Sequence, residues 1–159
     1  MSQPSSSSSL KVFISYAHED DKWRIELEKH LSNLQNQGLI SNWSDRQISA
    51  GAEWEAEINR NLEAAQIILL LISSAFMASD FCYSKELERA IERHNAGEAR
   101  VIPIIVRYVD WDGAPFEKLQ AVPTDGKPIV SSKWDSTDQA FVNVIRYIRK
   151  AVKELNGSV

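Results

Sequence analysis

Apolar residues along the chain fall into five short runs, separated by longer segments in which apolar and polar positions mix. We expect these runs to be strands, at residues 11–16, 39–43, 66–73, 100–106 and 128–132. The third and fourth runs are continuously apolar rather than alternating. That pattern is typical of strands in a parallel sheet that is covered on both faces.

Between the strands, apolar residues recur three or four positions apart, which is the spacing of one helix face. Asp20 or Asp21 is expected to cap the first helix, and Gly38 and Gly97 are expected to end the first and third. The four predicted apolar stripes are Trp23, Leu27, Leu31 and Leu34; Trp54, Ile58, Leu62 and Ala65; Leu87, Ala90, Ile91 and His94; and Phe141, Val144, Ile145, Ile148, Val152 and Leu155.

Alternating strands and helices predict an α/β fold with right-handed crossover connections. We expect a flavodoxin-like, doubly wound, five-stranded parallel sheet in the order 2-1-3-4-5, with helices on both faces. In such a sheet, ligands bind beyond the carboxyl ends of the strands, at the point where the strand order reverses. For this order the reversal lies between the first and third strands, so the segments after Tyr16 and Ser73 are the first candidates for a site.

The chain has 159 residues, a length that suits one domain. Residues 1–9, "MSQPSSSSS", are rich in serine and have little to bury. We expect them to be a disordered tail or linker, and residues 10–157 to form the folded domain.

Composition argues against several classes of protein. A net charge of −4 and a pI near 5.4 disfavour binding of nucleic acid through bulk electrostatics. No apolar run approaches the roughly 20 residues needed to cross a bilayer, so no membrane association is expected. Cys82 is the single cysteine and cannot form an internal disulfide. A reducing, cytoplasmic location is therefore the simplest expectation.

Several common catalytic motifs are missing from the sequence. There is no GxxxxGK[ST], GxGxxG or GxSxG, and the three histidines are scattered without ligand spacing, so no metal site is expected. A phosphorelay receiver domain has the same kind of sheet, but it needs an aspartate at the end of the third strand. This chain has Ser73, Ser74 and Ala75 there. A receiver-like domain is therefore a weaker alternative than the two functions considered below.

Four segments, taken in order, resemble the Toll/interleukin-1 receptor (TIR) domain family, in particular its bacterial members. "KVFISYAHEDD" looks like box 1 and "NWSDRQISAGAEW" looks like box 2, the BB loop. "SSAFMASDFCYSKELERA" resembles the strand C to helix C segment, and "ARVIPIIVRYVDW" with "APFEKLQAVP" resembles strand D and its loop. The resemblance covers about residues 10–155.

The resemblance implies one of two functions. Some TIR domains cleave NAD⁺ at the nicotinamide–ribose bond, often in immune or phage defence, whereas others are adaptors that act only through TIR–TIR contacts. The enzymes use one glutamate on helix C, in a pattern like W-C-x-x-E, and Glu86 occupies the matching position. Four residues before Glu86 this chain has Cys82 instead of the tryptophan, with an aromatic residue on either side. The residues expected to contact the substrate are Ser15, Tyr16, Ala17, Asp45, Arg46, Gly51, Trp54, Phe81, Cys82 and Tyr83.

The chemistry of NAD⁺ cleavage fits a site with one carboxylate. Breaking the glycosidic bond builds positive charge on the ribose, which a nearby carboxylate stabilises. Nicotinamide leaves as a neutral group, so no general acid is required. NAD⁺ is then a substrate, and no cofactor is expected. Two ordinary alternatives for Glu86 are a solvated residue near a helix N-terminus and an ion pair with Arg89 or Arg93.

We therefore expect an NAD⁺ glycohydrolase that releases nicotinamide and either ADP-ribose or a cyclic isomer. The family resemblance implies activation by self-association with other TIR domains. No sensor domain follows Val159, so the trigger is expected in another protein or in a removed part of the chain. The alternative is a non-catalytic TIR–TIR scaffold, which the missing tryptophan favours modestly. Trp54, Trp111 and Trp134 are each as consistent with the core as with the cleft.

Overall fold

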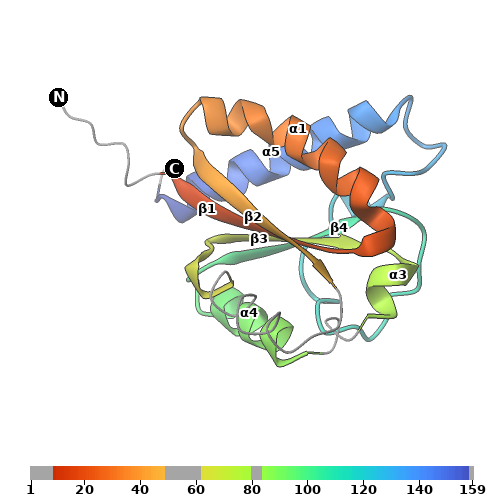
Figure 1. Ribbon diagram of the computed structural model, residues 1–159, viewed down its shortest axis with the longest axis horizontal. Coiled ribbons are helices and arrows are strands. Elements are labelled where there is room, and N and C mark those ends of the chain that lie inside the picture. The colour runs from red at the N-terminus through yellow and green to blue at the C-terminus, as the bar shows by residue number, and fades with distance from the viewer. Residues whose placement is uncertain (1–8, 49–61, 80–83, 158–159) are drawn as a thin grey trace.

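A parallel four-stranded sheet forms the centre of the molecule (Figure 1). The computed structural model describes residues 9–48, 62–79 and 84–157. Its sheet order is β2-β1-β3-β4, which confirms the predicted order of the first four strands. The strands are β1 (Leu10–Ala17), β2 (Ile40–Ile48), β3 (Ile67–Ile72) and β4 (Arg100–Ile105).

Helices cover both faces of this sheet. In Figure 1, α1 and α5 lie on one face, and α3 and α4 lie on the other. The helices are α1 (Asp21–Asn36), α3 (Ser74–Met77), α4 (Lys85–Asn95) and α5 (Thr137–Leu155), with short 3₁₀ turns η2 (His18–Asp20) and η4 (Thr124–Gly126). The short helix α3 was not expected from the sequence.

The core has two parts, one on each face of the sheet, because successive residues of a strand point to opposite faces. Val12, Ile14 and Tyr16 of β1 pack with α1 and α5, whereas Phe13 packs with residues of α3 and α4. Every residue of β3 is buried. This burial on both faces is what the continuous apolar run 66–73 predicted.

Both predicted helix-ending glycines are confirmed. Gly38 has φ of 77° and Gly97 has φ of 79°, a left-handed conformation that glycine adopts without a steric penalty. The N–H of Gly38 donates to the carbonyl of Gln35 at 3.0 Å, which closes the end of α1. At the other end of α1, the prediction that an aspartate side chain caps the helix is wrong. Asp20 holds the cap position, but its side chain makes no capping hydrogen bond.

Residues 128–132 do not form the predicted fifth strand. Ile129 and Val130 donate their N–H groups to the carbonyls of Ile105 and Val106, both at 2.9 Å, so the segment lies beside the end of β4. Pro128 has no N–H to donate, and Val122 already forms a parallel bridge with Ile104. Two short segments therefore share the edge of β4, and neither makes enough contacts to form a strand.

The second strand is longer than predicted. We expected it to end at residue 43, but β2 continues to Ile48 by pairing with β1. The helix expected around residues 54–65 lies mostly outside the described residues, as does the serine-rich tail up to residue 8. Among the helices within residues 9–48, 62–79 and 84–157, none is both long and apolar enough to cross a bilayer.

Candidate functional site

The carboxyl ends of β1 and β3 lie next to each other, because these two strands are paired in parallel. The chain leaves β1 toward β2 on one side, and it leaves β3 toward β4 on the other. The reversal of strand order therefore falls between β1 and β3, where ligands of such sheets bind. The turn η2 and the helix α3 follow these two strands at this end of the sheet (Figure 1).

A buried acid, Asp20, joins the exits of three strands at this end. Its carboxylate accepts a hydrogen bond from the hydroxyl of Ser73, which directly follows β3. Its other oxygen accepts one from Nη2 of Arg107, two residues after the end of β4, at 3.2 Å. The Ser73 hydroxyl also accepts from the backbone N–H of Phe76 at 3.2 Å and so caps α3. These contacts fix the segments that follow β1, β3 and β4 relative to one another.

The three candidate residues of β1 are brought to this end, but their side chains are enclosed. Ser15, Tyr16 and Ala17 are 1%, 4% and 4% exposed. The Tyr16 ring belongs to the core on the α1 and α5 face, where the Arg24 guanidinium lies 5.3 Å from its centroid. The Tyr16 ring is thus on the face opposite α4, so the predicted contact of Tyr16 with substrate does not fit its ring.

The box 2 candidates lie partly in a strand rather than in a loop. Asp45 and Arg46 are residues of β2, in register with Ile14 and Ser15 of β1. Their backbone is therefore fixed beside β1 at the carboxyl end. The remaining candidates, Gly51, Trp54, Phe81, Cys82 and Tyr83, lie outside the described residues.

Glu86 lies in the first turn of α4, which begins at the carboxyl end of the sheet because α4 runs back between the parallel strands β3 and β4. Ser84 caps this helix, and its hydroxyl accepts the N–H of Leu87 at 3.1 Å. Leu87 is buried and Glu86 is half-buried. The cap and the buried leucine hold Glu86 at the flank of the core.

Neither arginine that could neutralise Glu86 does so. Arg89 binds Glu63 instead, with Nε 2.8 Å from Oε2, and this hydrogen bond lowers the pKa of the Glu63 carboxyl. Arg93 turns into the core and donates to the carbonyls of Leu62 and Ala65 at 2.6 and 2.8 Å. Among the described residues, no hydrogen bond or ion pair joins Glu86 to a partner. None of the described residues therefore competes with a ligand for its carboxylate.

Two of the ambiguous tryptophans are partly buried and pack against the core. Trp111 stacks on Phe116 with ring centroids 6.2 Å apart and packs on the α3 and α4 side. Trp134 packs on the α1 and α5 side, and its indole N–H donates to the carbonyl of Pro128 at 2.9 Å. Neither needs a role in ligand binding to explain its position.

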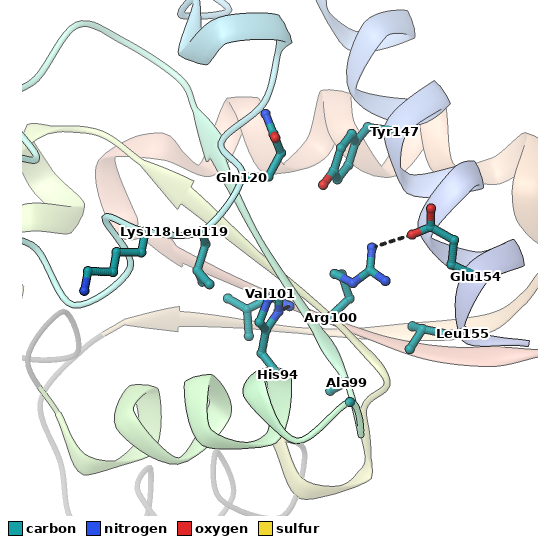
Figure 2. A pocket seen from close by; sticks show the side chains of 11 residues that line it. His94, Ala99, Arg100, Val101, Lys118, Leu119, Gln120, Tyr147, Glu154 and Leu155 are labelled. Atoms are coloured by element: carbon teal, nitrogen blue, oxygen red, sulfur yellow. Dashed lines mark hydrogen bonds and ion pairs between the residues drawn. The ribbon is translucent and has the colours of Figure 1, made fainter.

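A cavity of about 480 Å³ opens at the amino end of the sheet, away from Glu86. Figure 2 shows that it is lined from the end of α4, the start of β4 and the end of α5, by His94, Arg100, Tyr147 and Glu154 among others. The acid in this cavity is already paired, since Arg100 Nη1 lies 3.0 Å from Glu154 Oε1. The cavity is large enough for a small ligand, but it offers no unpaired carboxylate to a ribosyl cation.

His94 should make stability depend on pH. Its Nδ1 accepts the N–H of Val101 at 3.0 Å, and burial, followed by the nearby Arg100, lowers the pKa of His94. Below about pH 6.5 the unfolded chain then binds a proton that the folded protein resists. The free energy of unfolding should fall between pH 7.5 and 5.5, and His94→Gln, whose amide oxygen can accept the same N–H, should flatten this fall. Urea unfolding at pH 7.5 and 5.5 measures the free energy of unfolding of the wild type and of His94→Gln. An equal decrease in the two proteins would contradict this role of His94.

Histidine also contributes to one possible group of metal ligands among the described residues. Ligand atoms of Glu26, His30 and Asp138 lie within 4.8 Å of one another, and His30 Nε2 is 3.3 Å from Asp138 Oδ1. Asp138 is exposed and Lys29 already pairs with Glu26 at 3.2 Å, so ordinary surface pairing accounts for the group. Sequence spacing missed it because Asp138 lies 108 positions from His30.

The fold and the site together define an α/β domain with a parallel sheet in the order β2-β1-β3-β4, with candidate ligand-binding groups at the strand-order switch. The chain belongs to the TIR domain family, whose model matches residues 12–143. It is 51% identical over 140 residues to the uncharacterized protein y4lF of Sinorhizobium fredii, a bacterial relative. That match covers 88% of this chain and 43% of y4lF, so the chain spans less than half of its relative's length.

The fold resembles that of an animal TIR domain. The crystal structure of the TIR domain of the Toll-related receptor TRR-2 from Hydra magnipapillata superposes with a TM-score of 0.56 at 21% sequence identity. The match covers 89% of this chain and 99% of the Hydra chain. At this identity the likeness shows a shared fold.

Proposed function

We propose that this TIR domain cleaves NAD⁺ at the nicotinamide–ribose bond, with Glu86 as the carboxylate that stabilises the ribosyl cation. One observation carries the proposal. Glu86 is half-buried in the first turn of α4, at the carboxyl end of the sheet, and the neighbouring arginines Arg89 and Arg93 are engaged elsewhere. The family resemblance supports this choice, because the TIR enzymes use a glutamate at the matching position of helix C.

The reaction needs little beyond this carboxylate. When the bond between ribose C1′ and the ring nitrogen breaks, its electron pair neutralises the nicotinamide ring, and positive charge develops on the ribose. A half-buried carboxylate stabilises this charge more strongly than a solvated one, because less water screens it. Water then attacks C1′ and loses a proton to solvent, which gives ADP-ribose. Capture of the cation by the adenine ring of the same molecule would give a cyclic product.

Self-association is part of the proposed function, since TIR domains generally interact through TIR–TIR contacts. We place the activity in bacterial defence signalling, on the family resemblance alone. A non-catalytic scaffold is the second candidate. The feature that favours it is Cys82, which stands where the family's enzymes usually have a tryptophan.

The two candidates predict different results when rising concentrations of protein are incubated with NAD⁺. The enzyme should release nicotinamide at a rate that rises more steeply than protein concentration, because the active form is an assembly. Chromatography of the products measures the rate and separates ADP-ribose from a cyclic isomer. If the protein sediments as an assembly but releases no nicotinamide at the highest concentration, the scaffold is correct and the enzyme is not.

A further inference from the structure

Asp20 and Arg107 form an ion pair in which the acid is buried and the arginine is partly exposed. The side chain of Asp20 is 1% exposed, whereas that of Arg107 is 44% exposed. A buried carboxylate is stable only when it is paired and hydrogen-bonded. Ser73 and Arg107 meet that need from two different strand exits. The pair therefore holds one end of the Arg107 guanidinium in place while the rest of the group faces solvent.

Most of the donors of Arg107 are unused by the part of the chain that the structure describes. A guanidinium has five N–H groups, and one nitrogen of Arg107 binds Asp20. Within residues 9–48, 62–79 and 84–157, Arg107 makes no other hydrogen bond or ion pair. Nearby arginines differ in this respect, since Arg24 is paired with both Asp21 and Glu28. Arg107 is therefore a cation fixed by Asp20, with donors that no other described residue uses.

The position of Arg107 is the position of a ligand group in this kind of sheet. The N–H of Val106 donates to the carbonyl of Ile72 at 2.8 Å, so the chain remains alongside β3 until just before Arg107. Arg107 thus lies beside Ser73 at the carboxyl end, on the same side of the strand-order switch as α3 and the start of α4. Ligands of doubly wound sheets bind beyond this end.

We infer that Arg107 binds the diphosphate of the dinucleotide and that Asp20 is a positioning residue that aims it. This inference rests on the proposed function for the identity of the substrate. A planar fork of N–H donors matches phosphate oxygens in pairs, and a guanidinium held at one nitrogen loses little rotational freedom on binding. Asp20 offsets part of the positive charge, so the contribution of Arg107 is mainly two directed hydrogen bonds. These bonds hold the remote part of the substrate while Glu86 acts at the ribose.

The test measures binding of ADP-ribose by calorimetry alongside the kinetics of NAD⁺ cleavage. Arg107→Gln should raise the dissociation constant for ADP-ribose, and the KM for NAD⁺, by roughly tenfold to hundredfold, the effect of losing a charge-assisted hydrogen bond. The kcat should stay near that of the wild type, because the diphosphate is remote from the reacting bond. Arg107→Lys, which keeps the charge without the fork, should give an intermediate value. Arg146→Gln, an exposed change on α5, is the matched control and should bind as the wild type does.

Asp20→Asn separates positioning from simple destabilisation. The asparagine oxygen can still accept from Ser73, but the charge that holds Arg107 is gone. The KM should rise while kcat and the cooperative unfolding transition are retained. Equal binding of ADP-ribose by the wild type and a folded Arg107→Gln overturns the inference, as does a wild type that binds no ADP-ribose. Arg107-dependent binding in a wild type that releases no nicotinamide supports the inference and overturns the proposed activity, so the two failures are distinguishable.

Discussion

Glu86→Gln should reduce the kcat for nicotinamide release by at least about a hundredfold, the usual effect of removing a group that stabilises transition-state charge. Glutamine has almost the same shape as glutamate but carries no charge. The charge on the ribose develops only as the bond breaks, so the KM for NAD⁺ should change little. The structure supports a clean result, because Glu86 has no partner among the described residues that the change would leave unpaired. Initial rates over a range of NAD⁺ concentrations give both constants.

Glu88→Gln is the matched control for this prediction. Glu88 lies in the same first turn of α4 and is also acidic, but it is exposed. The two changes alter net charge and the helix N-terminus equally, so any effect through the helix dipole should appear in both. If both variants lose activity to the same extent, or if Glu86→Gln keeps the wild-type kcat, Glu86 is not the catalytic carboxylate.

Arg93→Leu should lower the free energy of unfolding by about 3 kcal/mol, because it leaves buried acceptors without donors. Arg93 is 7% exposed, and one nitrogen donates to the carbonyls of both Leu62 and Ala65. Those carbonyls lie in the segment just before β3, so the hydrogen bonds of Arg93 connect α4 to that segment. Leucine fits a helix as well as arginine does, so helix propensity does not contribute. Urea unfolding followed by circular dichroism measures the change.

Arg89→Leu is the control for this second prediction. Arg89 is on the same helix, and its partners Glu63 and Glu92 are both exposed, so the change removes only surface ion pairs. Its effect should be much smaller than that of Arg93→Leu. Similar losses in the two variants would mean that the buried hydrogen bonds of Arg93 do not stabilise the fold.

The fold was largely predictable because most of its strands and helices have a recognisable hydrophobic pattern in the local sequence. The run around residues 66–73 is apolar at every position since β3 is buried on both faces, and the stripe of α5 has the spacing of one helix face. The prediction of a fifth strand was wrong because of a contact between segments distant in the sequence. Ile129 and Val130 have the composition of a strand, but Val122 already occupies part of the edge of β4. Local pattern does not reveal such competition.

The candidate site was predictable only in part. Glu86 and the β1 residues were placed at the carboxyl end by the strand order and the family resemblance. Asp20 was expected to cap a helix, because nothing nearby reveals its partners Ser73 and Arg107, which lie 53 and 87 positions away. Arg93 was named only as an alternative partner of Glu86, and its burial was not predicted. Its position three residues after the buried Ala90 was the available signal that it faces the core.

We propose that NAD⁺ binds at the carboxyl end of the sheet, with its ribose at Glu86. Backbone amide shifts of the Glu86→Gln variant, recorded by NMR as NAD⁺ is added, test this most directly, because the variant should bind substrate without consuming it. We predict that the largest shifts fall at Ser73, Ser84 and Arg107. Shifts centred on His94 and Arg100 at the amino end, or no shifts at saturating NAD⁺, would contradict the claim.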